Sequence, residues 1–280
     1  MSSPSSPTAA LPCLVALDTA TEVAHLALSL GAEVHTQALG GAAQASATTL
    51  PGLQAMLAQA GTGWPAVQAI AFGQGPGAFT GLRTACAIAQ GLALGLNLPV
   101  IALDTLMAVA ESARREQPAV AQALAAGAGP LWVLQDARMS EVYAAAYTWS
   151  GNTAAGDVGD ASEAPSGTWQ QVVAPALWPL AHWQAQIDAG QITLAAGNAL
   201  LAYPAHTEAL QAQGAVLAPA AQPDGAALAR LAQQAWVRGE TLDAALALPL
   251  YVRDKVAQTT AERTAERTAE RTADGATSRA

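Results

Sequence analysis

Gly73-Gln74-Gly75-Pro76-Gly77-Ala78-Phe79-Thr80-Gly81-Leu82-Arg83 is the stretch that decides the fold. It lies between an apolar segment, Val67 to Phe72, and a segment rich in small residues, Thr80 to Leu96. Four glycines and a proline within these eleven residues indicate a backbone that turns sharply or lets another surface come close. We therefore predict a strand over 67–72, a tight loop, and a helix over 80–96.

The segments around this loop predict the order β-β-β-α-β-α-β-α, which is that of a ribonuclease H-like lobe. A dinucleotide-binding domain would instead begin β-α-β. The prediction depends on apolar alternation in the strands and on helical spacing of Leu53 and Leu57 in the first helix. The expected strands are Leu14 to Leu17, Val23 to Leu30, Glu33 to Leu39 and Val100 to Leu103, and the expected helices run from about Thr49 to Ala60 and from Asp104 or Thr105 to about Arg115.

A second lobe is expected after Gly127-Ala128-Gly129-Pro130. It opens with two hairpin-linked strands, Leu131 to Ala137 and Glu141 to Trp149, as the first lobe does. We expect the α/β class, with the chain divided into a ragged tail over 1–12, a first lobe over 13–126, a second lobe over 127–256 and a disordered tail over 257–280. Other expected elements of the second lobe are an exposed loop from Gly151 to Gly167, a strand from Ile192 to Ala196, a helix from Asp224 to Arg238 and an extended Tyr251-Val252-Arg253.

The composition excludes several classes of function. Twelve basic against 21 acidic residues give a formal charge of −9, which disfavours direct binding of tRNA or DNA. Cys13 and Cys86 have no motif spacing and are expected to be reduced cytosolic thiols. The four histidines form no H-x-x-x-H pair, so we expect no metal site and no metalloprotease. The chain start lacks a signal-peptide pattern, and no run of roughly 18 apolar residues predicts a membrane span.

Asp18-Thr19-Ala20-Thr21-Glu22 closes the first predicted hairpin and has two interpretations. In one, it is a phosphate loop in which Asp18, Thr19 and Thr21 help to hold a nucleotide. In the other, it is a polar turn whose short side chains bond to their own backbone. The sequence alone favours neither.

The glycine-rich loop has a rival interpretation as well. Gly73, Gly75 and Ala78 satisfy the G-x-G-x-x-A pattern of dinucleotide-binding folds, and Asp104 ends the next strand. Pro76 removes one backbone N–H from such a phosphate site, and three strands precede the unit. Both features disfavour dinucleotide binding.

The helix after the loop carries two columns of small residues. One column would satisfy packing of the helix on its own sheet, whereas two columns suggest close neighbours on two sides. We therefore expect one column to face the sheet and the other to face a different chain. The columns are Gly81, Ala85, Ala89 and Ala93, and Ala87, Gly91 and Gly95.

The pieces quoted above, in this order, resemble the bacterial TsaB or YeaZ family of the tRNA threonylcarbamoyladenosine system, also called glycoprotease-like or M22-type. The resemblance covers residues 13 to 256, and its closest motif is Gly75 to Arg83. The other matching segments are Leu17 to Glu22, Ile88 to Ala93, Asp136-Ala137-Arg138-Met139-Ser140-Glu141-Val142-Tyr143 and Tyr251-Val252-Arg253.

The resemblance implies two ribonuclease H-like lobes of the actin, sugar-kinase and heat-shock-chaperone superfamily. It also implies a cytoplasmic, non-catalytic subunit that supports transfer of a threonylcarbamoyl group from threonylcarbamoyl-AMP to N6 of the adenosine beside the anticodon. The expected partners are a paralogous TsaD-like catalytic subunit, a TsaE-like ATPase and, only through the complex, tRNA. A homodimer is expected for the chain alone. No cofactor is expected to bind tightly, although ATP or ADP could lie at a subunit interface.

The resemblance and the residue pattern together give two sets of candidate site residues. The expected partner surface consists of Leu53, Leu57, Gly75, Pro76, Gly77, Phe79, Thr80, Gly81, Arg83, Ala85, Ala87, Ala89 and Gly91. The expected lining of a cleft between the lobes consists of Asp136, Arg138, Glu141, Tyr143, Tyr251 and Arg253.

The alternative function is an ATP-dependent phosphotransferase or ATPase on the same fold. Kinases of this fold have a second phosphate loop, Asp-x-Gly-Gly, at the corresponding hairpin. Here Arg138 and Met139 stand where those glycines would admit phosphate.

We therefore expect the purified chain to hydrolyse neither ATP nor peptides. The measurement is steady-state phosphate release, with a peptidase assay in parallel. Turnover of ATP that Asp18→Ala abolishes would contradict this expectation and favour the alternative.

Overall fold

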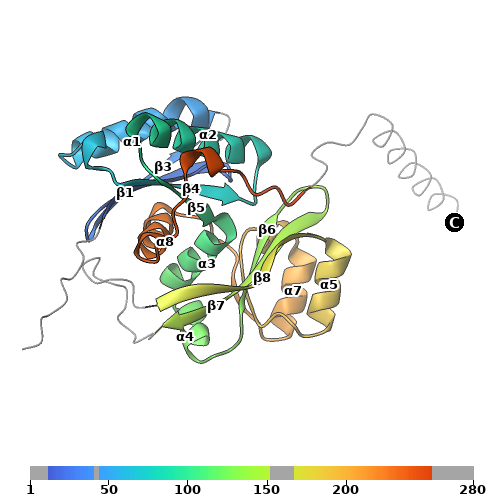
Figure 1. Cartoon of the computed structure of the whole chain (residues 1–280). Helices are drawn as coiled ribbons and strands as arrows, with labels where there is room; N and C mark the ends of the chain where they lie inside the picture. The colour runs from blue at the N-terminus through green and yellow to red at the C-terminus, as the bar shows by residue number, and fades with distance from the viewer. Residues whose placement is uncertain (1–11, 41–43, 152–166, 254–280) are drawn as a thin grey trace, which may run out of the picture.

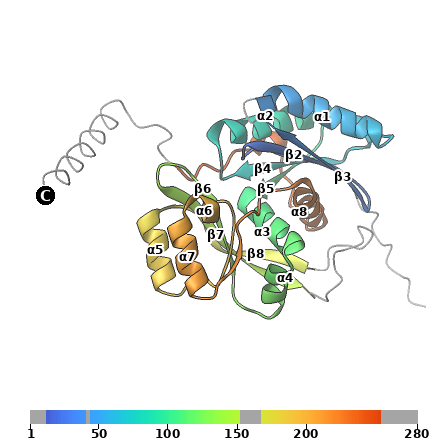
Figure 2. The same ribbon diagram turned by 180° about the vertical axis from the view of Figure 1, so that it is seen from behind.

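The computed structural model describes residues 12–40, 44–151 and 167–253. The predictions for residues 1–11, for most of the loop after Gly151, and for the repeat tail lie outside these residues. Within them, two mixed five-stranded sheets are flanked by helices in five layers (Figures 1 and 2). This is the expected two-lobed ribonuclease H-like α/β fold.

The first sheet has the strand order β3-β2-β1-β4-β5. β1 pairs antiparallel with β2 and parallel with β4, as expected for three meandering strands followed by crossover helices. α1 begins at Ala45, earlier than the predicted Thr49. The elements are β1 Cys13–Asp18, β2 Val23–Leu30, β3 Glu33–Gly40, α1 Ala45–Gln59, η2 Trp64–Ala66, β4 Ala69–Gly75, α2 Phe79–Leu96, β5 Val100–Asp104, α3 Thr105–Glu116 and α4 Pro118–Ala125.

The second sheet has the order β10-β9-β6-β7-β8, which repeats the topology of the first. The strand β8 was not predicted, because its prolines and irregular hydrophobicity conceal it. As an edge strand, β8 tolerates proline. The elements are β6 Leu131–Asp136, β7 Glu141–Gly151, β8 Gly167–Pro179, α5 Leu180–Asp188, β9 Leu194–Ala196, α6 Ala199–Ala202, α7 Pro204–Ala212, β10 Val216–Ala218, α8 Gly225–Val237 and η3 Ala244–Leu246.

The two faces of the first sheet differ in side-chain size. Leucines, valines and Phe72 face α1 and α2, whereas the face toward the core between the lobes carries Ala16, Ala27, Ala69 and Ala71 together with Leu14, Ile101 and Leu103. These alanines let α8 lie close to the sheet, and a Cβ on Gly225 of α8 would stand 2.6 Å from the backbone oxygen of Leu26. Although the segment 127–256 was predicted as the second lobe, α8 returns to cover the first sheet.

The helix α2 uses its two small-residue columns differently. Gly81, Ala85, Ala89 and Ala93 are buried against the sheet, while Ala87, Gly91 and Gly95 are exposed. Among the described residues, α2 is also the one helix long and apolar enough to cross a membrane, with 33% of that span buried inside the fold. Core helices of globular proteins can meet the same criteria, as the packing of α2 on β4 illustrates.

The turn Asp18 to Ala20 sits inside the glycine-rich loop, and this contact explains the glycines. A Cβ on Gly73 would lie 1.8 Å from Asp18 Oδ2, and one on Gly81 would lie 1.8 Å from the backbone oxygen of Thr19. A Cβ on Gly77 would lie 2.6 Å from the backbone oxygen of Ala20. The two motifs quoted from the sequence therefore fit each other, since only a residue without a side chain leaves this space.

A chain of hydrogen bonds joins this turn to the second lobe. Thr105 Oγ1 donates to Asp18 Oδ2 at 2.7 Å. The neighbouring Asp104 caps α3 by accepting from the backbone N–H of Leu106, and its Oδ2 accepts from Tyr147 Oη at 2.6 Å. Burial raises the pKa of Asp104 to about 6, although the bonds from Tyr147 and from the helix N–H groups oppose this shift.

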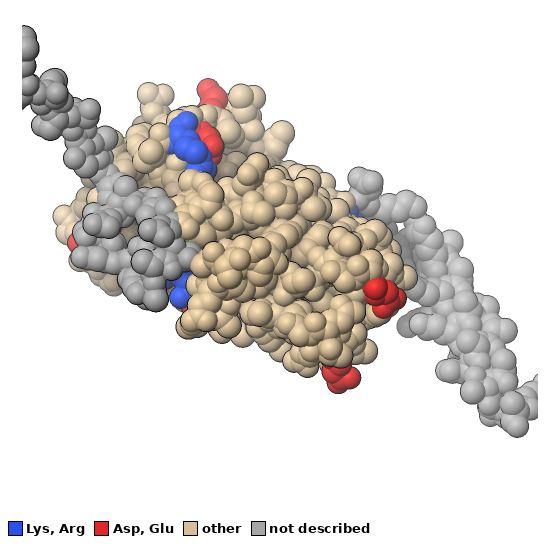
Figure 3. Space-filling view, turned by 90° about the horizontal axis from the view of Figure 1, so that it is seen from below, with Lys and Arg blue, Asp and Glu red and all other residues tan. Residues whose placement is uncertain are grey.

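Charged side chains are sparse on the face seen from below in Figure 3, where Asp, Glu, Lys and Arg are scattered singly or in small groups. Every arginine in the described residues except Arg83 forms an ion pair with an acid. Apart from Arg83, the few positive charges of the described residues are therefore already neutralised locally.

Gly81→Ala should destabilise the protein, whereas Gly91→Ala on the same helix should stabilise it. The first methyl group collides with the Thr19 backbone, while nothing lies within 4 Å of the second. Alanine favours a helix over glycine by about 0.5–1 kcal/mol. Denaturant unfolding of both variants measures the difference; equal stabilities would show that the turn does not fill the loop.

Asp104→Asn should change how stability depends on pH. Because the folded-state pKa is raised, the folded state binds the proton more tightly, and wild type loses stability as the pH rises from 3.8 to about 6. The variant lacks this loss, so the difference in unfolding free energy between the two proteins should vary across that window. Tyr147→Phe removes a bond that lowers the pKa, and should extend the window upward. Parallel pH profiles for wild type and Asp104→Asn would contradict the assignment.

Candidate functional site

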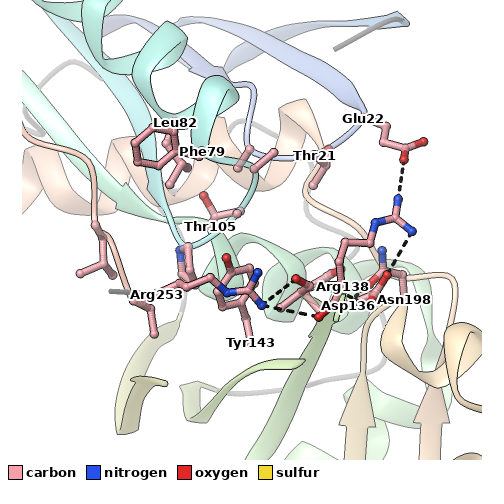
Figure 4. A pocket seen from close by; sticks show the side chains of 18 of the residues that line it. Thr21, Glu22, Phe79, Leu82, Thr105, Asp136, Arg138, Tyr143, Asn198 and Arg253 are labelled. Carbon is pink, nitrogen blue, oxygen red and sulfur yellow. Dashed lines mark hydrogen bonds and ion pairs between the residues drawn. The ribbon is translucent and has the colours of Figure 1, made fainter. Parts of the chain in front are cut away.

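A cavity of about 610 Å³ lies between the two lobes (Figure 4). One wall comes from the first lobe and is mainly apolar, with Ala20, Pro76, Phe79 and Leu82. The other wall comes from the second lobe and is polar. It includes Gln135, Asp136, Arg138, Tyr143 and Asn198. The volume is within the range of small-molecule sites, roughly 300–1,000 Å³.

The proposed phosphate loop lines this cavity with Ala20, Thr21 and Glu22 only. Asp18 and Thr19 are buried and do not line it, whereas Thr21 does. Asp18 Oδ1 accepts from the backbone N–H of Ala20, and Thr19 Oγ1 donates to the backbone oxygen of Gly81. Burial raises the pKa of Asp18. The geometry corresponds to the polar-turn interpretation, because the groups meant for phosphate already bond within the protein.

The hairpin between β6 and β7 forms the rim of the cavity. Arg138, Met139 and Ser140 have φ values of 62°, 55° and 56°, in the left-handed region. Such a conformation costs roughly 1–2 kcal/mol per residue without glycine, so other contacts must hold the hairpin. The side chain of Asp136 supplies one of them, since its Oδ1 accepts from the backbone N–H of Arg138 at 2.9 Å.

Arg138 also crosses the mouth of the cavity. Its guanidinium pairs with Glu22 of the first lobe at 3.0 Å and with Asp136 at 3.3 Å (Figure 4). The ends of this bridge at Arg138 and Glu22 are exposed, so the pair contributes little to stability. Its position nevertheless connects the two lobes directly over the cavity.

The segment after η3 closes another side. Leu250 donates its backbone N–H to the backbone oxygen of Gln74, and Tyr251 stacks on Phe79 with ring centroids 5.0 Å apart. Arg253 then reaches the hairpin, where its Nη2 donates to the backbone oxygen of Ala137 and to Glu141. This stretch, residues 247–253, is called the strap below. It joins the first lobe to the left-handed hairpin.

The structure thus brings the expected cleft residues together. Asp136, Arg138, Tyr143, Tyr251 and Arg253 line the cavity, and Glu141 supports it through Arg253. The pKa of Tyr143 is raised, mainly by burial. Sequence reasoning missed Gln135, Asn198 and Leu250, which have no motif of their own, and it did not assign Glu22 of the Asp18–Glu22 turn to the cleft.

The residues expected at a partner surface divide into two groups. The buried ones belong to the core or to the loop: Leu53, Leu57, Gly75, Pro76, Gly81, Ala85 and Ala89. Those at least partly exposed are Gly77, Phe79, Thr80, Arg83, Ala87 and Gly91. The structure adds Leu94, which is 65% exposed beside the second column of α2, and Leu246, which is 68% exposed on η3 packed against α2.

No group of three His, Cys, Asp or Glu side chains in the described ranges is placed to hold a metal ion. Arg138 and Met139 form the tip of the hairpin at the rim of the cavity. The cavity therefore offers hydrogen-bonding and apolar surface.

The comparisons with known proteins agree with one another. A family model described as "TsaD: tRNA N6-adenosine threonylcarbamoyltransferase" matches residues 40–261. The Escherichia coli (strain K12) protein named tRNA threonylcarbamoyladenosine biosynthesis protein TsaB is 32% identical over 255 residues, covering 87% of this chain and 96% of the relative. The Haemophilus influenzae protein of the same name is 43% identical over 133 residues, 46% of this chain and 51% of the relative.

Solved structures support the same grouping. YeaZ from Pseudomonas aeruginosa superposes with a TM-score of 0.67 at 32% identity, covering 86% of this chain and 99% of that one. A second structure from that organism, described as similar to peptidase YEAZ, gives a TM-score of 0.69 at 32% identity over 86% and 100%. Sequence and fold agree over most of each chain, and this chain therefore belongs to the TsaB (YeaZ) family of tRNA threonylcarbamoyladenosine biosynthesis proteins.

Proposed function

We propose that this chain is a non-catalytic subunit of the complex that transfers a threonylcarbamoyl group from threonylcarbamoyl-AMP to N6 of the adenosine beside the anticodon. Its role there is to support a paralogous TsaD-like catalytic subunit. The observation that carries the proposal is the filled phosphate loop, in which Asp18 and Thr19 are buried under the glycine-rich loop.

A phosphate group could reach Asp18 or Thr19 only if the two motifs separated. Separation would break the Thr19 bond to Gly81 and the backbone bond from Ala78 to Ala20. It would also expose the apolar start of α2. Catalysis by this chain would therefore need a rearrangement of its core, and for that reason the phosphotransferase alternative is not favoured.

The start of α1 supports the same assignment. The resemblance to the TsaB family implies that the corresponding helix of the catalytic paralogue carries metal-ligand histidines. Here the first turn reads Ala45-Ser46-Ala47-Thr48-Thr49, with Ala45 and Thr49 buried. Side chains of this kind pack against a sheet and supply no imidazole to a metal.

The proposed partner surface is the exposed side of α2. Ala87, Gly91 and Gly95 form a shallow column there, with the exposed side chain of Leu94 beside it. Small residues allow another helix to approach at the short end of the usual ~8–10 Å axis spacing. An apolar surface of this shape suits a helix of the catalytic subunit.

The charge distribution suits binding of tRNA through the complex. The chain has a formal charge of −9, and the ion pairs described above neutralise nearly all of the arginines in the described residues. A phosphate backbone needs unpaired basic side chains. We therefore assign direct tRNA contact to the other subunits. Six further expectations stay predictions: a TsaE-like ATPase partner, nucleotide at a subunit interface, a homodimer, no tightly bound cofactor, no membrane contact and a cytoplasmic location.

Ala87→Trp should leave the monomer folded and abolish both complex formation and tRNA modification. The exposed position accepts the indole in the free chain, but the larger side chain prevents close approach of a partner helix. The measurements are circular dichroism of the variant, binding to the purified catalytic subunit, and modification of tRNA in a reconstituted assay.

Two control variants make this result interpretable. Ala185→Trp places the same side chain at an exposed position of α5 in the second lobe, and should change none of these readouts. Ala85→Trp enters the core and should destabilise the fold by about 1–3 kcal/mol or more. Normal binding and modification by Ala87→Trp would exclude this side of α2 as the interface.

A further inference from the structure

Arg83 is an isolated charge in this chain. Between Val34 and Leu103 it is the one Asp, Glu, Lys or Arg residue, and this span contains the whole of α1 and α2. The segment 244–252, which includes η3 and most of the strap, carries no charged residue. Each of the other arginines in the described residues pairs with an acid. Within those residues, the fold therefore supplies no acid to neutralise Arg83.

The guanidinium of Arg83 is nevertheless held in one orientation. Its Cζ lies 3.8 Å from the centre of the Phe79 ring, and its Nε donates to Tyr251 Oη at 3.0 Å. Phe79 and Tyr251 contact each other in turn. Because the bond to Tyr251 uses Nε, both Nη atoms at the outer end of this exposed side chain face a potential partner. A planar fork that is held in advance loses little rotamer freedom when it binds a carboxylate through two hydrogen bonds.

The surface around Arg83 is apolar. The exposed column of α2 begins four residues later at Ala87, so Arg83 lies at one end of the proposed partner surface. Along the flank of α2 runs the segment of η3 and the strap, red in Figure 1, where Gln90 Nε2 donates to the backbone oxygen of Ala247. Four of the nine large apolar side chains exposed in the described residues belong to these elements: Leu94, Leu246, Leu248 and Tyr251. Exposed apolar side chains that gather on one face indicate an interaction site.

The charge of Arg83 distinguishes between two kinds of partner. In a two-fold symmetric dimer of identical chains, the same surface lies on both sides of the interface. A second copy that docked through this surface would bring a second Arg83 and no acid, because α1, α2 and the segment 244–252 contain none. Burying an arginine without an acid is unfavourable. A different chain can present a carboxylate instead.

We propose that Arg83 binds an aspartate or glutamate carboxylate of the catalytic subunit, and that this pair makes the α2 surface select that subunit over a second copy of this chain. The inference rests on the proposed function, since it names the chemistry that the catalytic subunit presents opposite α2. The exposed leucines and Tyr251 surround the pair in the complex and exclude water from it. Arginines in such surroundings often dominate the affinity of an interface.

The first test is binding of Arg83 variants to the purified catalytic subunit, measured by titration calorimetry. Removing one partner of a desolvated ion pair leaves the other unpaired, so Arg83→Gln should raise the Kd about thirtyfold or more, and Arg83→Glu should raise it further. Arg83→Lys keeps the charge without the planar fork and should have an intermediate Kd. The matched control is Arg238→Glu, which makes the same change of charge at the end of α8, on the other face of the first sheet, and should leave the Kd unchanged.

Self-association of the chain alone should respond in the opposite direction. Arg83→Gln removes the charge that a second copy would have to bury unpaired, so this variant should dimerise at a lower protein concentration than wild type. The measurement is analytical ultracentrifugation over a concentration series. Unchanged or weaker self-association of Arg83→Gln would contradict the proposed selectivity.

Charge reversal on the partner separates the ion pair from a structural role of Arg83. The surface aspartates and glutamates of the catalytic subunit are changed to lysine one at a time, and one of these variants should restore binding to Arg83→Glu while weakening binding to wild type. Rescue requires a folded Arg83→Glu chain, so it excludes misfolding as the cause of the loss.

Two results would overturn the inference while leaving the proposed function intact. One is wild-type affinity of Arg83→Glu for a catalytic subunit that binds the wild-type chain. The other is a loss of binding that no lysine variant of the partner restores. Failure of the wild-type chain itself to bind the catalytic subunit would overturn the inference and the proposed function together.

Discussion

The fit of the turn Asp18–Ala20 into the glycine-rich loop is the contact on which the rest of the molecule depends. It fixes the start of α2 against the end of β1, because the Gly81 backbone lies directly on Thr19. It also places Asp18 where Thr105 can bond to it, and Thr105 begins α3. The same contact therefore positions the helix proposed to meet a partner and the helix that carries the second lobe. The hydrogen bonds of this contact use the side chains of Asp18 and Thr19, which a phosphate-binding loop would need for phosphate.

The two lobes are held together by several chemically different connections. Asp104 bonds to Tyr147, Arg138 pairs with Glu22, and the strap runs from α2 to the hairpin. Deeper in the interface, Glu111 is fully buried, accepts hydrogen bonds from Arg114 and Trp169, and forms an ion pair with Arg230. A buried carboxylate is tolerated only when it is fully paired, and removing one partner typically costs about 3–5 kcal/mol. Together, these connections hold the two lobes against each other in the folded chain.

Much of this architecture follows from the sequence, for identifiable reasons. The order of elements in the first lobe is readable because its strands are apolar or alternating and are bounded by glycine or polar turns. The cleft residues on the hairpin and at Tyr251 and Arg253 were predicted from motifs. Two features could not be predicted. The strand β8 is concealed by its prolines. The return of α8 to the first sheet is not predictable either, because amphipathic spacing shows that a helix has a buried face but not which sheet covers that face. Gln135 was not predicted as a lining residue, because a lone glutamine in a strand belongs to no motif and only the fold places it at the cavity.

The return of α8 has a consequence for how the chain is made. The last strand of the first sheet ends at Asp104, and α3 then covers part of the inner face, but α8, which covers β1, β2 and β3, begins only at Gly225. At ribosomal speed the interval is on the order of ten seconds, during which this face of the nascent sheet waits without its cover. Besides Leu14, Ile101 and Leu103, the face that waits carries Ala16, Ala27, Ala69 and Ala71, whereas the larger side chains on the other face meet α1 and α2 early in synthesis. Alanine presents less apolar area than leucine or phenylalanine, and adhesion between unfinished chains grows with that area. The small side chains that let α8 pack closely therefore also reduce the apolar area that the half-made protein exposes.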